Sequence, residues 1–310
     1  MKKITICGAT GFIGTNLVRK FSKKYKVYAI YNKKKPFSLK NVKWVKADLR
    51  NYKDCLKVTS LSKILIQAAA TTSGSKDIIN NPFLHVTDNA IMNSYLLKAS
   101  YVNSIEKFIF TSCTVMYHHS KKPLSENDVV ESRIFKNYYG VGHTKLYVEK
   151  MCNFYSKISN IKFSVVRHSN IYGPYDKFSL SKGHFIGSSI KKAFLKKKFI
   201  QIFGAGNEKR DYLFVDDFLN FIEKLITKQK NNFEIINCTY GKSFKIIDIL
   251  KKIIKFSKTQ KKIKKIKGKN INVDILVNSN KAKKLLDWIP NVSIDEGLKK
   301  TIKWYQNEIL

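Results

Sequence analysis

The first half of the chain alternates short apolar runs with longer amphipathic stretches. The apolar runs are rich in β-branched residues, and the stretches between them repeat apolar side chains with the period of a helix. This alternation is typical of βαβ units, in which helices cover both faces of a parallel sheet. The predicted strands are residues 3–7, 27–31, 42–45, 64–67, 108–111 and 163–167, and the predicted helices are residues 15–22, 88–100 and 145–158.

The pattern becomes irregular after Arg167. Gly173-Pro174 and later glycines interrupt it, and helices are predicted only at residues 216–227 and 246–256. Irregular segments of this kind commonly carry binding sites. The fold class expected is therefore α/β, with a doubly wound parallel sheet and a smaller α/β substrate-binding lobe. The sheet is assigned to residues 1–168, rejoined by about 212–240, and the lobe mainly to residues 169–310.

The charge of the chain is unusual. Its 310 residues are 44% hydrophobic, enough for an ordinary core, but the formal net charge is +37. Nearly all the basic residues are lysines, whereas arginine makes the bidentate contacts that nucleic-acid recognition favours. We therefore expect a lysine-rich solvated surface, including a solvated helix or loop at residues 258–269, and no nucleic-acid partner. The five arginines are Arg19, Arg50, Arg133, Arg167 and Arg210.

Five scattered cysteines without C-x-x-C spacing predict neither a disulfide framework nor a zinc site. Asp216 and Asp217 stand together, but they open an apolar helix and are expected to cap it rather than bind metal. No signal peptide and no run of eighteen apolar residues is visible. A cytoplasmic protein without metal or membrane association is expected.

A glycine-rich turn follows the first predicted strand and opens an amphipathic helix. Glycines there permit a tight turn and let backbone N–H groups approach a pyrophosphate, which the positive end of the helix stabilises. This is the context that a dinucleotide-binding turn requires. The residues expected to bind NAD or NADP are Gly8, Thr10, Gly11, Phe12, Ile13 and Gly14.

The G-x-x-G-x-x-G spacing resembles the extended short-chain dehydrogenases/reductases, the NAD-dependent epimerase/dehydratase family with a Rossmann-type domain. Later segments extend the resemblance over nearly the whole chain. The resemblance implies that Asp48 contacts the adenine and that a loop covers the nicotinamide. The cofactor contacts it implies are Asp48, Leu49, Ala68, Ala69, Ala70, Asn89, Lys145 and His168.

The choice between NAD and NADP is left open by the end of the second strand. NAD-specific relatives place an acid there, which accepts hydrogen bonds from the ribose hydroxyls. In this chain the position holds Asn32, followed by Lys33 and two more lysines that could pair with a 2′-phosphate. The same lysines also belong to the general lysine excess, so both cofactors stay candidates.

The resemblance implies a catalytic tyrosine one helical turn before a lysine, because residues four apart share a helix face. Val141 stands four residues before Lys145, so the usual spacing is absent. If the helix starts near Gly142 and the preceding backbone loops, Tyr139 could still reach a sugar. Tyr139 is the predicted proton-transfer residue, with Tyr138, His143 and a purely packing role as alternatives.

A hydroxyl at the end of the preceding strand is the third catalytic group that the resemblance implies. Cys113 occupies its place, and because a thiol is a weak donor, Thr114 or Ser112 is expected to take the role. Val115 leaves no carboxylate for the elimination chemistry of relatives that are dehydratases. It also leaves incomplete the Cys–His pair by which relatives like GDP-L-fucose synthase invert sugar carbons.

Two later segments, residues 167–186 and residues 204–217, resemble the GDP-L-fucose synthase and GDP-mannose epimerase branch. The resemblance implies that Asn170 lies beside a sugar diphosphate and that His184 has a catalytic or substrate-binding role. It implies that Arg210 clamps the diphosphate, for which the planar guanidinium is suited. Lys191 or Lys192 is a further candidate cation, and an exposed helix face explains these lysines equally well.

The chain is therefore predicted to be a nucleotide-sugar oxidoreductase. Hydride transfer at C4 of a GDP-linked hexose or heptose for surface-polysaccharide synthesis fits best, because the dehydratase and inverting residues are absent. A C4 epimerase is the second interpretation, and a cofactor-binding module without chemistry is the third. Relatives commonly dimerise through two helices beside the sheet, so a homodimer is expected.

Overall fold

The computed structural model describes residues 1–72, 81–120, 122–267 and 274–310. A seven-stranded sheet forms the larger part of the molecule, with its strands in the order β10-β6-β5-β4-β1-β2-β3 and all neighbours parallel. The doubly wound α/β fold predicted from the hydrophobic pattern is confirmed. The strands are β1 (Lys3–Cys7), β2 (Lys26–Tyr31), β3 (Val42–Lys46), β4 (Ile64–Gln67), β5 (Lys107–Cys113), β6 (Lys162–His168) and β10 (Phe233–Cys238).

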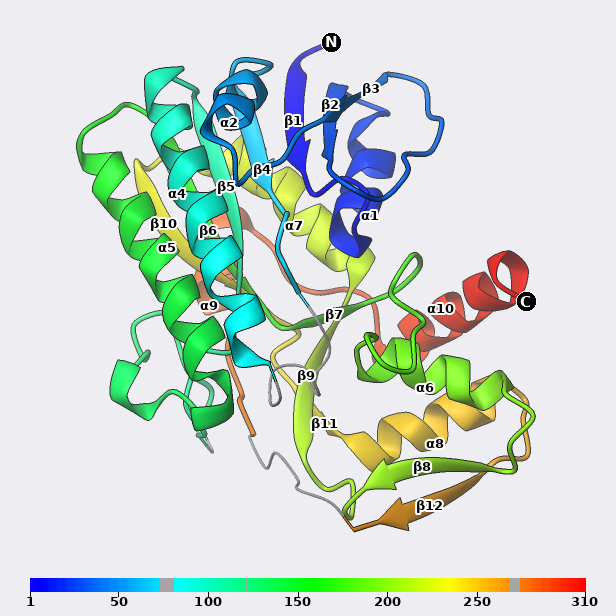
Figure 1. The fold of residues 1–310 in the computed structure, drawn as a ribbon. Coiled ribbons are helices and arrows are strands. Elements are labelled where there is room, and N and C mark those ends of the chain that lie inside the picture. Colours follow the sequence, from blue (N-terminus) through cyan, green and yellow to red (C-terminus); the bar gives the residue numbers. More distant parts are fainter. Residues whose placement is uncertain (73–80, 121, 268–273) are drawn as a thin grey trace.

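Helices cover both faces of this sheet (Figure 1). Because side chains alternate along a strand, Ile4 and Ile6 of β1 pack into one apolar core while Cys7 packs into the other. The first core contains side chains of α1 (Phe12–Phe21) and α7 (Val215–Lys228). The second contains side chains of three helices, which are α2 (Tyr52–Thr59), α4 (Thr87–Val102) and α5 (Tyr139–Lys157).

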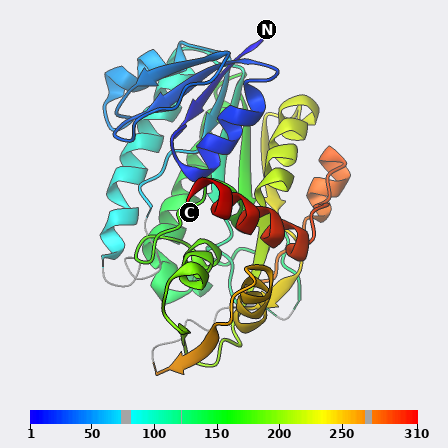
Figure 2. The ribbon, with the colours of Figure 1, turned by 90° about the vertical axis from the view of Figure 1, so that its right-hand side faces the viewer.

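A second lobe lies at the carboxyl ends of the strands, below the sheet in Figure 1. It contains a three-stranded sheet in the order β11-β9-β7 and a two-stranded sheet of β12 and β8. Figure 2 shows α10 lying between this lobe and the large sheet. The elements of the lobe are β7 (Asn170–Tyr172), α6 (Phe185–Phe194), β8 (Phe199–Phe203), β9 (Lys209–Phe214), β11 (Ser243–Lys245), α8 (Ile246–Phe256), β12 (Lys262–Ile266) and α10 (Ile294–Glu308).

The chain returns from this lobe to the large sheet with α7 and β10. β10 pairs with β6 at the sheet's edge, and α9 (Asn280–Leu286) packs against α7 and β10. Three short 3₁₀ helices complete the described elements. They are η1 (Pro82–His85), η2 (Glu131–Arg133) and η3 (Lys136–Tyr138).

The lysine-rich run at residues 258–269 departs from expectation. A solvated helix or loop was predicted, but residues 262–266 form the strand β12, paired in parallel with β8. Ile263 lies opposite Ile200 and packs against the core, which explains why this segment is a strand although its lysines face solvent. The last two residues of the run lie outside the described residues.

A buried polar network ties the strands together beneath the carboxyl edge of the sheet. Arg167 of β6 and Glu149 of α5 form an ion pair of 2.6 Å with side chains only 4% and 2% exposed. Glu149 also accepts a 2.6 Å hydrogen bond from Ser112, and Arg167 donates one of 3.0 Å to Tyr117. Because each partner satisfies the other's buried charge, the network holds β5, β6 and α5 in register.

Removing one partner of this pair should destabilise the fold strongly. The variant Glu149→Ala leaves the Arg167 guanidinium buried without a counter-charge, a defect that costs about 3–5 kcal/mol. Urea unfolding followed by circular dichroism measures the difference. The matched control is Glu131→Ala, which removes an equally short but exposed ion pair to Lys150 and should leave the midpoint almost unchanged. Equal midpoints for the two variants would contradict the structural role of the network.

Candidate functional site

Two positions of the turn between β1 and α1 have room only for glycine. Gly8 has φ +70°, and a Cβ there would lie 2.6 Å from the Cα of Ala69. A Cβ on Gly14 would lie 2.1 Å from the carbonyl oxygen of Gly8. Both distances are far below van der Waals contact, so the backbones of the first turn and of the segment after β4 touch directly.

The start of α1 is suited to an anion. Gly11 is the N-cap residue, no side chain caps the helix, and its first turn contains no acidic residue. The N–H groups of the first turn therefore point out of the helix with the positive end of the helix dipole behind them. The turn has the features that a dinucleotide pyrophosphate requires, which are a flat glycine surface and unused backbone donors. The residues present fit NAD or NADP.

The end of the site predicted to hold adenosine contains a residue that sequence reasoning missed. Arg50 donates to both carboxylate oxygens of Asp48, at 3.0 and 2.8 Å, and also approaches Asp88 at 3.3 Å. The hydrogen bonds from Arg50, with a further one from Asn32, lower the pKa of Asp48 to about 2. Asp48 is therefore an anion whose orientation Arg50 fixes. The predicted 2′-position residues Asn32 and Lys33 are both exposed.

The segment after β4 is anchored by α4. The Asn89 side chain accepts a 2.9 Å hydrogen bond from the N–H of Thr71 and donates one of 3.0 Å to its carbonyl. The amide of Ala69 donates to the side chain of Gln67 at 3.2 Å. Asn89 thus holds the loop that contains the three predicted alanines, Ala68, Ala69 and Ala70, against the glycine turn.

Lys145 lies on the inner side of α5. Its ammonium donates a 2.9 Å hydrogen bond to the carbonyl of Thr111 on β5, and burial lowers its pKa. α5 is a regular helix from Tyr139, so the condition under which Tyr139 could reach the sugar, a helix that starts near Gly142, is not met. Gly142 is buried, and a Cβ added there would lie 3.0 Å from Cγ2 of Ile134. We attribute the continuation of the helix through its two glycines to this close packing, because glycine itself disfavours a helix.

The unbroken helix decides which residue shares a face with Lys145. Residues four apart on a helix are neighbours, and Val141 holds that position. Tyr139 is six residues away, about 240° around the helix axis, and its side chain is 62% exposed. Its ring contacts that of His143 with centroids 4.3 Å apart. The structure therefore does not bring Tyr139 and Lys145 together, and the looped backbone that would have done so is absent.

The end of β5 separates the three candidate hydroxyl or thiol groups. Ser112 points to the opposite face, where it is bound to Glu149, so the expectation that it faces the substrate was wrong. Cys113 is partly exposed, whereas the other four cysteines are buried. Desolvation by the surrounding protein nevertheless raises the pKa of its thiol. Thr114 is partly exposed beside it, and its N–H donates to the carbonyl of His168 at 3.1 Å.

His168 ends β6 next to this group. Its Nδ1 donates a 2.8 Å hydrogen bond to the carbonyl of Ser169, and burial lowers the pKa of the imidazole to about 4. The Lys145 ammonium contributes to the same shift. His168 is therefore neutral at physiological pH, with Nε2 left as an acceptor.

The second lobe supplies the residues predicted to bind substrate. Asn170 begins β7 and donates to the carbonyl of Asp211 at 2.9 Å. His184 is the N-cap residue of α6, and its pKa is lowered by desolvation and by the charges of Lys177 and Arg210. Lys191 lies in the last turn of α6, at the opposite end of that helix from His184.

Arg210 of β9 is a desolvated cation without an ion-pair partner among the described residues. Its neighbours are the phenols of Tyr138 and Tyr212 and, more weakly, Glu208, and no carboxylate of the described chain lies within 4.0 Å. The phenols raise its pKa against the opposing effect of desolvation. A partly buried guanidinium in this state is prepared to receive an anion.

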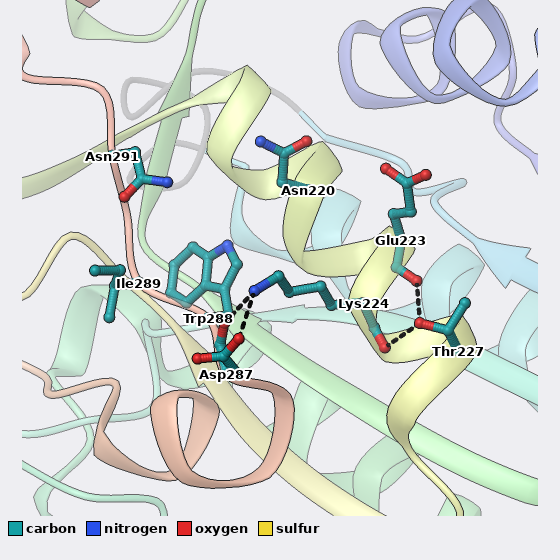
Figure 3. Close-up of a pocket in the computed structure, with 8 residues that line it drawn as sticks. All are labelled: Asn220, Glu223, Lys224, Thr227, Asp287, Trp288, Ile289 and Asn291. Atoms are coloured by element: carbon teal, nitrogen blue, oxygen red, sulfur yellow. Dashed lines mark hydrogen bonds and ion pairs between the residues drawn. The ribbon is translucent and has the colours of Figure 1, made fainter.

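A separate pocket of about 400 Å³ lies between α7 and the segment after α9 (Figure 3). Lys224 and Asp287 form an ion pair across it. The pocket contains none of the residues predicted to bind cofactor or substrate. In the described part of the chain, no cluster of side chains suited to a metal ion is present, and no helix is long and apolar enough to cross a membrane.

The model of the NAD dependent epimerase/dehydratase family matches residues 4–239. The chain belongs to this family. The matched residues include the glycine turn, Lys145 and Arg210. The family model therefore covers both the large sheet's predicted cofactor site and the first strands of the second lobe.

Relatives in the family act on different nucleotide sugars. The chain is 29% identical over 282 residues to UDP-glucuronate 4-epimerase of Thermodesulfobacterium geofontis, covering 87% of this chain and 81% of the relative. It is 26% identical over 313 residues to GDP-L-colitose synthase of Yersinia pseudotuberculosis, covering 99% and 98%.

Solved structures of the family share the fold. UDP-glucose 4-epimerase of Thermotoga maritima, with UDP-glucose, matches with a TM-score of 0.88 at 24% identity, covering 99% of this chain and 100% of that one. UDP-glucuronic acid 4-epimerase of Bacillus cereus, in complex with UDP-glucuronic acid and NAD, matches with a TM-score of 0.85 at 25% identity, covering 98% and 99%.

The variant Gly14→Ala should impair cofactor binding, because its methyl group would collide with the carbonyl of Gly8. We expect the affinity for NAD or NADP to fall by at least roughly tenfold, or about 1.4 kcal/mol. Calorimetric titration measures this loss. The control is Gly241→Ala, which strains a backbone of φ +79° in open space and should leave the affinity unchanged. Unimpaired binding by Gly14→Ala would contradict the assignment of this turn.

Acid should destabilise the protein through His168. Its pKa is about 4 in the fold and 6.5 without burial, so between these values the unfolded chain binds more protons. The free energy of unfolding is therefore unaffected by this group above pH 6.5 and decreases as the pH falls from 6.5 to 4. The carboxyl groups of Asp176 and Asp211, both raised to about 6, act in the opposite sense.

Comparison with His168→Asn isolates the contribution of the imidazole. The difference in unfolding free energy between wild type and variant should change with pH between 6.5 and 4, with a slope of at most about 1.4 kcal/mol per unit. Urea titrations across this range measure the slope. A difference that does not depend on pH would show that His168 is not buried as described.

Proposed function

We propose that the protein is an NAD(P)-dependent nucleotide-sugar oxidoreductase that transfers hydride at C4 of a GDP-linked hexose or heptose. The observation that carries the proposal is the pairing of two anion-binding features in one family fold. They are the start of α1, which no side chain caps, and the guanidinium of Arg210, which forms no ion pair with any residue that the structure describes. A dinucleotide and a sugar nucleotide each contain a pyrophosphate to match one of them.

The proposed cofactor site runs along the carboxyl edge of the large sheet. The glycine turn would hold the pyrophosphate, Asp48 and Arg50 the adenosine end, and Lys145 the nicotinamide ribose. The bound nicotinamide would supply the hydride acceptor or donor. NAD and NADP are both compatible with Asn32 and Lys33, and the structural relative from B. cereus contains NAD.

The proposed substrate site lies in the second lobe. Arg210 would bind the diphosphate, with Asn170 and His184 beside it and Lys191 as a more distant cation. The relationship to GDP-L-colitose synthase and, at 25% identity, to GDP-mannose 3,5-epimerase of Arabidopsis thaliana supports a GDP-linked sugar. A role in surface-polysaccharide synthesis stays part of the proposal.

Proton transfer is assigned to Tyr139, with Cys113 and Thr114 at the strand end facing the sugar. Tyr139 can reach the sugar if the first turn of α5 opens on substrate binding. Two features favour this opening. No side chain caps the helix, and Gly140 and Gly142 lie in its first turn, each costing about 1 kcal/mol in helix propensity.

Two alternative functions have support of their own. The 4-epimerases among the sequence and structural relatives favour a C4 epimerase, in which the same carbon is oxidised and then reduced. The presence of Val141 on the Lys145 face, and of a thiol at Cys113, favours a cofactor-binding module without chemistry. Formation of a reduced cofactor with GDP-sugars separates the oxidoreductase from both alternatives.

A homodimer is proposed from the outer faces of α4 and α5. Large apolar side chains are exposed along both helices, which pack side by side against the sheet. A second copy burying these faces would form a symmetric four-helix interface. The exposed side chains are Ile91, Tyr95, Tyr101, Val102, Tyr147 and Phe154.

Loss of the Arg210 guanidinium should weaken substrate binding. Charge-assisted hydrogen bonds contribute about 1.5–3 kcal/mol each, so Arg210→Met should raise the Kd for GDP by roughly ten- to a hundredfold. Calorimetric titration with GDP measures this change. Arg133→Met, at an exposed arginine of η2, is the control and should bind GDP like wild type. Equal affinities for the two variants would exclude Arg210 from the site.

The phenol that transfers the proton can be identified with two substitutions. Tyr139→Phe should lower kcat by about 100-fold or more, the usual effect of removing a general acid or base, without changing NAD(P) affinity. Val141→Tyr restores the spacing of four and should rescue turnover in that background. The controls are Tyr147→Phe and Val141→Phe. Full turnover by Tyr139→Phe would remove Tyr139 from the mechanism.

A further inference from the structure

The two-stranded sheet of β8 and β12 has one face in the core and one face in solvent. Both strands lie at the end of the molecule far from the N-terminus (Figures 1 and 2). Ile200 and Ile202 are buried in the first core, and Ile263, which pairs with Ile200, packs against it. Because side chains alternate along a strand, the residues between them point outward. This outer face consists of Phe199, Gln201, Phe203, Lys262, Lys264 and Ile266.

Two phenylalanines make the outer face unusual for a surface sheet. Phe199 is 49% exposed and Phe203 is 62% exposed, so both rings are in contact with water. Phe203 pairs with the partly exposed Ile266 of β12. A sheet with one packed face normally presents polar side chains on the other. Apolar side chains gathered on the solvent face therefore indicate a second contact surface.

The same region carries positive charge that no nearby acid balances. The sequence contains no acidic residue between Asp176 and Glu208, and none between Asp248 and Asp274, and the two strands lie within these stretches. Among the described residues, no carboxylate lies within 4.0 Å of the ammonium groups around the face. The exposed lysines there are Lys196, Lys197, Lys198, Lys262, Lys264, Lys265 and Lys267.

This combination of side chains fits an anionic lipid surface. Aromatic rings enter the boundary between headgroups and acyl chains, and lysines spread around them attract acidic headgroups. A second copy of the same face is disfavoured, because like charges would oppose each other. Lysine is depleted at protein–protein interfaces, and the recognition of bases favours arginine, which the outer face and its flanks lack.

We propose that the outer face of β8 and β12 is a peripheral docking surface for membranes that contain anionic phospholipids. Phe199 and Phe203 enter the headgroup region, and the flanking lysines bind the phosphates. The expectation of no membrane association rested on the absence of a long apolar run, which excludes a span but not a contact at the surface. The face includes none of the residues assigned to cofactor or substrate, so this inference is independent of the proposed function.

Co-sedimentation with lipid vesicles tests the proposal. The protein should bind vesicles of phosphatidylcholine and phosphatidylglycerol in equal parts, and more weakly vesicles of phosphatidylcholine alone. Binding should weaken as salt is added, because salt screens exposed charges. The double variant Lys262→Gln/Lys264→Gln should lower the affinity about fivefold for each lysine removed. Phe203→Ser should lower it roughly three- to tenfold, since less apolar area enters the boundary.

Matched controls separate this face from the overall charge of the protein. Lys53→Gln/Lys57→Gln removes the same charge from exposed positions of α2, near the opposite end of the molecule in Figure 1. Phe83→Ser removes another exposed ring, which is 65% exposed in η1. Both controls should bind anionic vesicles like wild type.

A fluorescent reporter tests insertion without removing a side chain. The emission of Phe203→Trp should shift to shorter wavelength on anionic vesicles, because the indole leaves water for the membrane interface. Phe83→Trp should show no such shift. This measurement keeps the test valid if Phe203→Ser does not fold.

Three results would overturn the proposal. The first is wild-type protein that does not sediment with anionic vesicles. The second is an equal loss in the Lys262/Lys264 and Lys53/Lys57 variants, which would assign the binding to net charge alone. The third is a loss of affinity for single-stranded DNA or polyglutamate in the Lys262/Lys264 variant with unchanged vesicle binding, which would assign the face to a nucleic acid or an acidic protein.

Discussion

The contact on which the rest of the site depends is the one between the glycine turn and the end of β4. A Cβ at Gly8 would come within 2.6 Å of Ala69, so two backbones meet where most proteins would place side chains. The contact fixes the start of α1 over the carboxyl edge of the sheet. The ends of β4, β5 and β6 reach the same edge, and with them the loop held by Asn89, the thiol of Cys113 and the imidazole of His168.

The arginines show how the chain uses a scarce residue. Arg167 is paired with Glu149 inside the fold, and Arg50 is paired with Asp48 near its surface. Arg19 lies between the rings of Phe37 and Tyr175, at 4.6 and 4.5 Å from their centroids. Arg210 forms no ion pair among the described residues, and its neighbours are the phenols of Tyr138 and Tyr212 and, more weakly, Glu208. Compensated charges stabilise a fold, whereas an uncompensated one is best explained by a ligand.

Sequence patterns predicted the strands β1 to β6 and the cofactor turn, because both depend on local features; the strands of the second lobe, β10 and the helices α2, α6, α9 and α10 were missed. Apolar periodicity defines strands, and G-x-x-G-x-x-G after a strand has a direct steric cause in Gly8 and Gly14. The start of α5 could not be predicted in the same way. Gly140 and Gly142 argue locally against a helix, and the packing of Gly142 against Ile134 is a tertiary contact that overrides this preference.

Other misses have different causes. The orientation of Ser112 follows from strand alternation, which places it opposite Cys113, so the signal was present in the sequence. The role of Arg50 could not be predicted, because its pairing with Asp48 depends on the turn that follows β3. That Val141, and not Tyr139, shares a helix face with Lys145 follows only once the helix is known to be continuous.

The central claim is that one chain binds a dinucleotide at its glycine turn and a sugar nucleotide in its second lobe. Native mass spectrometry of the purified protein, with and without added NAD, NADP and GDP-mannose, tests it most directly. The account predicts one dinucleotide per chain and a further mass of one GDP-sugar on the same chain. Folded protein that takes up neither dinucleotide at saturating concentration would contradict it.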